Sequence, residues 1–359
     1  MADAAKKYLG ETVEVKEAHK FDVRRLDEFL AGAVAGYRGP LTVRQFEGGQ
    51  SNPTYLLTTP DRKYVLRRKP PGVLLKSAHA VDREFRVIAA LGSVGFPVPE
   101  ALAFSADDQV IGTMFYVMSH VDGRVFKDSS MPDLDHDQRA AVFDSANRTL
   151  AALHTVDYTA IGLGDFGRPG NYFARQIARW SQQYDASRTE DIPEMDRLIA
   201  WLPGAVPEGD ATACLLHGDF SFHNLLVHPT EPRVVAVLDW ELSTVGHPLG
   251  DLMYHMMEWY RPEGIDVRGT LKNKDLAALG IPDADRYAAL YARRAGIRLD
   301  GNLAFYRAYN LFRVAAILQG VAARLRQGIA ASADAAELAL RVRPIAVAGW
   351  AEAREAGAI

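Results

Sequence analysis

The sequence of 359 residues is poor in cysteine, in long apolar runs and in concentrated basic charge. Cys214 is the single cysteine, which excludes a disulfide framework and a four-thiolate zinc site. No uninterrupted apolar stretch of ~18 residues occurs, so no segment is expected to span a membrane. The net charge is −4 and no long basic run is present, so nucleic acid is not an expected partner.

A charged leader followed by an apolar core is also absent from the N-terminal residues, which argues against secretion and makes the cytoplasm the expected compartment. What is present is ordinary for a soluble globular protein: 48% hydrophobic and 24% charged residues. A chain of this length has room for two or three lobes, each with its own core.

The first part of the chain predicts a sheet with one helix. Residues 1–40 are expected to be peripheral, with a short amphipathic helix over 21–34. Apolar alternation and turn residues then predict five strands and a helix between the third and fourth strands. The strands are expected at 41–49, 52–60, 63–70, 101–104 and 112–118, and the helix at 77–92. Residues 119–124, SHVDGR, have the polar composition of a linker.

The rest of the chain is predicted to be mostly helical. Helices are expected over 135–156, 172–184 and 303–328, and the runs LLVHP and RVVAVLDW predict a β-hairpin embedded among them. The fold class is therefore α+β: an N-terminal antiparallel sheet with one helix, followed by a mostly helical lobe that contains a hairpin.

The segment LLHGDFSFHNLLV, residues 215–227, carries the clearest chemistry. Asp219 precedes Asn224 by five positions, and Asp239 ends the apolar run RVVAVL. The spacing D-x-x-x-x-N is that of a kinase catalytic loop, in which the aspartate accepts a proton and the asparagine holds a metal. Phosphoryl transfer needs a carboxylate near the acceptor hydroxyl and oxygen ligands for magnesium. Asp219 is thus the candidate base, and Asn224 and Asp239 are the candidate metal ligands.

A metal hydrolase is the rival interpretation of the same segment. His217, Asp219 and His223 could hold zinc or manganese. That interpretation gives Asn224 no role and does not explain the strand-rich region upstream. We expect His217 instead to hydrogen-bond the catalytic loop.

A kinase also needs groups upstream that contact the nucleotide phosphates. EGGQSNPTY lies between the first two expected strands, where Gly48 and Gly49 permit close backbone approach and Ser51 and Asn52 can donate to phosphate oxygens. Alternation along YVLRRKP puts Arg67 and Arg68 on opposite faces of the third strand. Arg67 can then hold phosphate and pair with Glu84 of the following helix.

These motifs together resemble the aminoglycoside phosphotransferase family. LLHGDFSFHNLLV and VLDWELSTVGHPLGDL resemble its catalytic and metal segments. VLRRKPPG, SAHAVDREFRV, GRPGNYFARQIARW and NLFRVAAILQG resemble the kinase-like region of acyl-CoA dehydrogenase family members ten and eleven. The resemblance implies a protein-kinase-like two-lobe fold. Residues 41–118 would form the nucleotide-binding N-lobe, 119–123 the hinge, and 124–359 the catalytic and acceptor-binding C-lobe.

The same resemblance implies ATP and Mg²⁺ as cofactors, and backbone groups of Ser119 and Val121 as partners of the adenine. Asp251 would be structural. Arginine stands at the position where most relatives have lysine, and His223 replaces a residue that is more often small.

The acceptor is expected to be a small molecule with a hydroxyl group. Arg261, Arg293, Arg294 and Arg298 suit an anionic or neutral acceptor better than a polycationic aminoglycoside. The subgroup resemblance implies a hydroxyacyl chain carried by coenzyme A, with any acyl-CoA dehydrogenase partner on a separate chain. An aminoglycoside or choline-type kinase is one alternative. A nucleotide-binding pseudokinase with a regulatory role is another.

Overall fold

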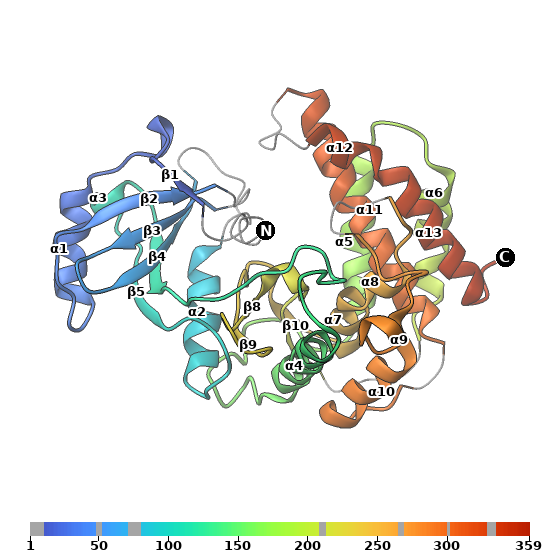
Figure 1. The fold of residues 1–359 in the computed structure, drawn as a ribbon. Coiled ribbons are helices and arrows are strands. Elements are labelled where there is room, and N and C mark those ends of the chain that lie inside the picture. Colours follow the sequence, from blue (N-terminus) through green and yellow to red (C-terminus); the bar gives the residue numbers. More distant parts are fainter. Residues whose placement is uncertain are drawn as a thin grey trace. The chain divides into compact units, whose positions relative to one another are not determined.

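The computed structural model describes residues 11–47, 52–70, 80–207, 213–264, 269–299, 302–328 and 335–359. The chain forms two compact units, coloured along the sequence in Figure 1. The first unit comprises residues 1–126, 159–163 and 223–243, and the second comprises 127–158, 164–222 and 244–359. Each unit is described by itself.

A six-stranded antiparallel sheet organises the first unit, with strand order β1-β2-β3-β4-β6-β5. The strands are β1 (Thr12–Val13), β2 (Thr42–Phe46), β3 (Thr54–Thr58), β4 (Lys63–Arg68), β5 (Ala101–Ser105) and β6 (Phe115–Ser119). Its helices are α1 (Val23–Ala33), α2 (Val81–Gly92), α3 (Asp108–Ile111) and the 3₁₀ turn η2 (Glu17–His19).

The strands bury alternate side chains on the two sheet faces, as their period of two requires. Leu57 of β3, Leu66 of β4 and Phe115 of β6 form one core with Leu26 and Leu30 of α1. On the other face, Phe85 of α2 stacks on Phe104 of β5 and contacts Tyr116 of β6. The sheet is therefore covered by α1 on one face and by α2 on the other.

A short hairpin, β8 (Leu225–Val227) and β9 (Val234–Val237), also packs in the first unit. The N–H of Val237 donates to the carbonyl of Pro97 at 2.8 Å, and the ring of Trp240 meets Phe96 edge to face. These contacts attach the end of β9 to the connection that follows α2.

The second unit is mostly helical. Its helices are α4 (His136–Thr155), α5 (Tyr172–Ser187), α6 (Pro193–Trp201), the 3₁₀ turn η3 (Leu202–Gly204), α7 (Pro248–His255), α8 (Met257–Tyr260), α9 (Leu276–Leu279), α10 (Ala284–Ala295), α11 (Ala304–Arg326), α12 (Ala335–Leu340) and α13 (Val342–Glu355). Strand β7 (Cys214–Leu216) pairs with β10 (Thr244–Gly246) and leads into the segment His217–Asp219.

A glycine in β10 permits the close packing of α5 on this small sheet. A Cβ atom added to Gly246 would lie 2.3 Å from the Tyr172 ring, so no larger residue fits without displacing the aromatic ring. Tyr172 begins α5, and its ring also lies against Gly250 of α7. The glycines thus let α5 and α7 approach the strand that precedes the candidate catalytic loop.

The element types follow the sequence closely, and two differences have physical causes. Residues 1–40 were expected to be peripheral, but the apolar stripe of α1 supplies Leu26 and Leu30 to the core, and β1 extends the sheet. The hairpin β8–β9 forms as expected, yet it packs with the first unit although it follows much of the second in sequence. The predicted division into an N-lobe, a hinge at residues 119–123 and a C-lobe stays a prediction.

Within the described residues, none of the helices combines the length and the apolar character that crossing a membrane requires.

Replacing Leu66 by alanine should destabilise the protein by about 2–5 kcal/mol, because the side chain is fully buried and a cavity would remain. Leu340→Ala is the matched control, since the same atoms are removed from a side chain that is 78% exposed. That change should stay within about 0.5 kcal/mol. Urea unfolding of both variants measures the difference, and equal losses would contradict this description of the core.

Candidate active site

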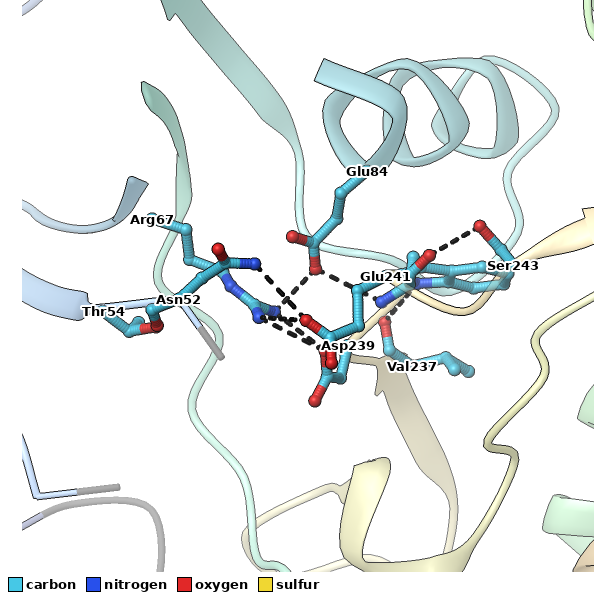
Figure 2. A network of polar contacts seen from close by, with 9 residues as sticks. Asn52, Thr54, Arg67, Glu84, Val237, Asp239, Glu241 and Ser243 are labelled. Carbon is cyan, nitrogen blue, oxygen red and sulfur yellow. Dashed lines mark hydrogen bonds and ion pairs between the residues drawn. The ribbon is translucent and has the colours of Figure 1, made fainter. Parts of the chain in front are cut away.

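Arg67 lies among three carboxylates in the first unit (Figure 2). One of its terminal nitrogens, Nη1, is 2.6 Å from Glu84 Oε1, and the other, Nη2, is 3.2 Å from Asp239 Oδ1. Glu241 Oε2 stands farther off, at 4.0 Å from Nη2. The predicted pair of Arg67 and Glu84 is thus present, and the structure brings the predicted metal ligand Asp239 to the same guanidinium.

Strand alternation explains why Arg67 and not Arg68 reaches this cluster. Arg67 points to the face covered by α2, where Glu84 is 1% exposed. Arg68 points to the opposite face, where it donates to the backbone carbonyls of His19 and Ile111 and stacks on the Phe21 and Tyr55 rings. The first arginine therefore belongs to the site and the second to the α1 side of the sheet.

Glu84 also fixes the backbone beside Asp239. Its Oε1 atom accepts from the N–H of Trp240 at 3.2 Å as well as from Arg67. Asp239 itself has φ of 65°, a left-handed conformation that is uncommon for a non-glycine residue and is often found at functional sites. Ser243 Oγ donates to the Trp240 carbonyl at 2.6 Å and closes the turn on its far side.

The environment of Glu84 raises its pKa to about 7 from 4.5. Burial is the largest cause, and the charges of Asp239 and Glu241 add to it. Arg67 acts in the opposite direction and lowers the pKa of Glu84. For Arg67, burial would lower the pKa, but Glu84 and the other acids raise it on balance. One guanidinium thus does not offset three carboxylates, so the cluster has excess negative charge.

Glu241 is a member of this cluster that sequence reasoning missed. It follows Asp239 by two positions in LDWE, and that second carboxylate after the strand end was the available signal. Asn52 is fully buried and donates from Nδ2 to Glu241 Oε2 at 3.3 Å. The predicted contact of Asn52 with phosphate stays a prediction, and Gly48, Gly49 and Ser51 lie outside the described residues.

Asn224 lies next to the strand that carries Asp239. It precedes β8, and its carbonyl accepts from the N–H of Leu238 at 2.9 Å. The side chains of Asn224 and Asp239 offer amide and carboxylate oxygens, the donors that a hard divalent cation prefers. The excess negative charge around Arg67 is a second feature that fits such a cation.

The predicted hinge follows β6. The N–H of Ser119 donates to the carbonyl of Glu100 at 2.9 Å, and Ser119 Oγ accepts from the Glu100 N–H at the same distance. The Ser119 carbonyl is therefore the backbone group of this residue that could accept a hydrogen bond from an adenine. Val121 is half-buried and lies beyond the strand.

The candidate base Asp219 lies in the second unit, in a loop whose backbone is held from several sides. Asp251 of α7 accepts from the N–H of His217 at 2.6 Å and from that of Gly218 at 2.9 Å. His217 accepts at Nδ1 from the N–H of Asp219 at 3.1 Å, which confirms its expected bond to the loop. Arg313 of α11 donates to the carbonyl of Gly218 at 2.5 Å.

Asp251 is itself held in the ionised state. Burial raises its pKa, but hydrogen bonding and charge from His154 and the contact with His217 lower it on balance. His154 Nε2 lies 3.4 Å from Asp251, and its Nδ1 contacts the hydroxyl of Tyr291. Asp251 therefore acts as the structural anchor that the sequence led us to expect.

The metal-hydrolase alternative lacks its site in the described part of the chain. Nowhere among those residues do three His, Cys, Asp or Glu side chains group as ligands of one ion. His217 is fully buried, and its Nδ1 already accepts from the loop backbone.

Comparisons with known proteins agree with this geometry. The sequence model of the phosphotransferase enzyme family matches residues 42–290. Acyl-CoA dehydrogenase family member 11 of Rattus norvegicus is 44% identical over 348 residues, which cover 94% of this chain and 44% of that protein. Member 10 of Mus musculus is 42% identical over 333 residues, covering 92% of this chain and 31% of that protein. The chain thus spans less than half the length of these relatives.

Solved structures confirm the predicted fold class. A crystal structure from Ralstonia eutropha JMP134, assigned as an aminoglycoside phosphotransferase, is 49% identical, covers 94% of this chain and 99% of its own, and superposes with a TM-score of 0.86. The ternary complex of aminoglycoside phosphotransferase APH(4)-Ia with ADP and hygromycin B is 17% identical, covers 94% and 99% of the two chains, and has a TM-score of 0.58. At that identity the second likeness shows the fold alone.

The raised pKa of Glu84 predicts a specific pH dependence of stability. The folded protein binds the Glu84 proton more tightly than the unfolded chain does, so this contribution is complete below pH 4.5 and is lost as pH rises through about 7. The slope is at most about 1.4 kcal/mol per pH unit for one proton. Urea unfolding between pH 5 and 8 should show that Glu84→Gln lacks this loss. Glu28→Gln, on the exposed face of α1, should keep the wild-type slope. Parallel pH profiles for Glu84→Gln and wild type would contradict the assignment.

Proposed function

The chain belongs to the phosphotransferase enzyme family and is a small-molecule kinase, and we propose that it transfers the γ-phosphoryl group of ATP to a hydroxyl of an acyl chain. The observation that carries the nucleotide part of this proposal is the Arg67 cluster. It combines a buried guanidinium suited to phosphate oxygens with carboxylates suited to a divalent cation.

In this proposal Arg67 orients the phosphates, and Glu84 orients Arg67. A guanidinium presents its donors in a rigid fork, so the carboxylate that holds one side determines where the other side points. Because Glu84 also accepts from the N–H of Trp240, one buried carboxylate sets both the arginine and the backbone next to Asp239. The Ser119 carbonyl and the Val121 N–H are the proposed partners of the adenine edge.

Asn224 and Asp239 are the residues that would hold Mg²⁺. A bound magnesium ion supplies charge neutralisation for the phosphate oxygens. Two hydrogen bonds hold the backbone beside these ligands. The N–H of Leu238 donates to the carbonyl of Asn224, and the N–H of Trp240 donates to the carboxylate of Glu84. The excess negative charge of the cluster supports a divalent cation at this position.

Asp219 is the proposed catalytic base. It would accept the proton of the acceptor hydroxyl while the hydroxyl oxygen attacks the γ-phosphorus, and the bond from phosphorus to the β,γ-bridging oxygen breaks to release ADP. The bonds from Asp251, His217 and Arg313 to the loop backbone keep this carboxylate in place. Such positioning is the main contribution that a protein makes to phosphoryl transfer.

The acyl acceptor rests on two kinds of support. The relatives that are 42–44% identical over more than nine-tenths of this chain carry the name of acyl-CoA dehydrogenases, and a hydroxyacyl chain bound to coenzyme A would suit that setting. Arg313, whose side chain bonds the backbone of the catalytic loop, also disfavours a polycationic acceptor. A pseudokinase role is less well supported, since Asp219, Asn224 and Asp239 are all present.

Replacing Asp219 by asparagine should reduce phosphate transfer by about 10²–10⁴-fold, because the neutral amide cannot accept the hydroxyl proton. Nucleotide affinity should change little. Transfer is measured by mass spectrometry of hydroxyacyl-coenzyme A, free hydroxy acids and aminoglycosides incubated with Mg-ATP, and nucleotide binding by calorimetry. Asp185→Asn on the exposed side of α5 is the matched control. Full activity of Asp219→Asn would refute its role as the base.

Asp239→Asn should raise the magnesium concentration needed for half-maximal nucleotide binding by about tenfold or more, since a charged oxygen ligand is replaced by a neutral one. A titration of Mg²⁺ at fixed ATP, followed by calorimetry, measures this shift. Asp61→Asn, which changes an exposed acid in the turn between β3 and β4, should leave the titration unchanged. Identical magnesium dependence in wild type and Asp239→Asn would show that Asp239 is not a ligand.

A further inference from the structure

Arg313 is a buried cation that forms no ion pair with a carboxylate among the described residues. Its side chain belongs to α11 and the residue is 5% exposed. Within the residues that the structure describes, its hydrogen bond goes to the Gly218 carbonyl, and no ion pair joins it to Asp or Glu. A buried guanidinium is normally paired with an acid, because desolvation of an unpaired charge is costly. Within the described residues no carboxylate therefore pairs directly with this charge.

Aromatic rings surround Arg313 in place of acids. Its guanidinium carbon lies 5.0 Å from the centre of the Tyr254 ring and 5.8 Å from that of Trp180. Tyr172 and Tyr309 also lie close enough to influence its pKa, and burial raises the pKa of both hydroxyls, so they stay neutral. Cation–π contacts stabilise the charge in part but leave its other N–H donors available.

Trp180 supplies a second donor without an acceptor. Trp180 is only 5% exposed, and its indole Nε1–H is buried. This N–H has no hydrogen-bond partner among the described residues. A buried N–H without an acceptor usually marks a place for a ligand or a water molecule. Trp180 comes from α5 and Arg313 from α11, and these are the two helices that carry the motifs GRPGNYFARQIARW and NLFRVAAILQG.

Arg313 lies close to the candidate base, and Trp180 lies beside Arg313. Arg313 bonds the carbonyl of Gly218, whose peptide continues directly into Asp219. Burial lowers the pKa of Arg313, but its neighbours, including the Asp219 charge, raise it on balance. A molecule whose hydroxyl approaches Asp219 would thus bring its neighbouring groups toward Arg313 and the adjacent Trp180.

We propose that Arg313 and the Trp180 indole N–H recognise a carbonyl or carboxylate oxygen on the hydroxyl-bearing acceptor. The inference rests on the proposed function and deepens it, because it assigns the acceptor a functional group as well as a hydroxyl. A free hydroxy acid would present a carboxylate and a hydroxyacyl thioester would present a carbonyl. Both accept hydrogen bonds from a guanidinium. An aminoglycoside offers ammonium groups, which the buried arginine would repel.

The other role for Arg313 is purely structural: its bond to Gly218 would only hold the loop. The two roles differ in their dependence on the acceptor. A structural residue changes turnover of every acceptor alike, whereas a recognition residue changes kcat/KM only for acceptors that carry the recognised oxygen.

The experiment measures turnover of three acceptors: a hydroxy acid, its coenzyme A thioester and the corresponding diol, which lacks the carbonyl oxygen. Each acceptor is tested with wild type and with the variants Arg313→Lys, Arg313→Met and Trp180→Phe. For the acid and the thioester we expect kcat/KM to fall about 10- to 100-fold in Arg313→Met and about 2- to 10-fold in Trp180→Phe. Arg313→Lys should recover part of the loss. The diol should be affected little. Arg179→Gln is the control, because this exposed arginine lies over the same indole ring.

Calorimetric binding of the hydroxy acid to Asp219→Asn, with and without Arg313→Met, is a readout independent of turnover. Weakened binding in the double variant supports the inference even if no phosphate is transferred, an outcome that would count against the proposed function alone. Equal losses of kcat/KM for diol, acid and thioester overturn the inference while the proposed function stands. Absence of measurable binding of the acid to Asp219→Asn, or binding unaffected by Arg313→Met, also overturns it. A loss confined to the thioester, or to the acid, identifies which source of the oxygen is used.

Discussion

The contact between Arg67 and three carboxylates is the constraint on which the first unit's site depends. Glu84 is almost fully buried and bonds both Arg67 and the backbone N–H of Trp240. It thereby joins the sheet, α2 and the segment after β9 through one side chain. Burial is the main cause of the raised pKa of Glu84, and the negative charges of Asp239 and Glu241 add to it. The cluster has more negative than positive charge. A divalent cation would offset the excess, so this arrangement suits a metal-bound nucleotide.

The candidate catalytic loop follows a different principle. Its backbone is bonded by the carboxylate of Asp251 and the guanidinium of Arg313, which come from helices far along the chain. Neither contact uses the side chain of Asp219. These contacts fix the peptides of the loop and so limit the positions that the carboxylate of Asp219 can occupy. Positioning of this kind lowers the entropic barrier to reaction.

The sequence was most informative where one element holds both members of a pattern. Alternation along β4 predicted that Arg67 and Arg68 point to opposite faces of the sheet. The position of Glu84 in the following helix then predicted its pairing with Arg67. The second carboxylate of LDWE was a signal for Glu241, but its place beside Arg67 follows a left-handed backbone at Asp239 that the sequence did not indicate. Arg313 lies 95 positions from the carbonyl it bonds, and the buried faces of α11 make it look like any other helix arginine. The arginines that the sequence favoured, Arg261 and Arg294, instead pair with Glu258 and Asp144.

The two units thus present opposite unmet electrostatic requirements. The first has carboxylates in excess of its arginine and is suited to a cation. In the described part of the second, the Trp180 indole N–H lacks an acceptor beside the buried cation Arg313, which suits an oxygen anion or carbonyl. Phosphoryl transfer to a hydroxyacyl compound would satisfy both, since Mg-ATP brings the cation and the acceptor brings the oxygen. A polycationic acceptor would bring ammonium groups, which cannot accept a hydrogen bond from Arg313 or from the Trp180 indole N–H. The fold is shared with aminoglycoside kinases, but the acceptor is chosen by side chains that the fold leaves open to change.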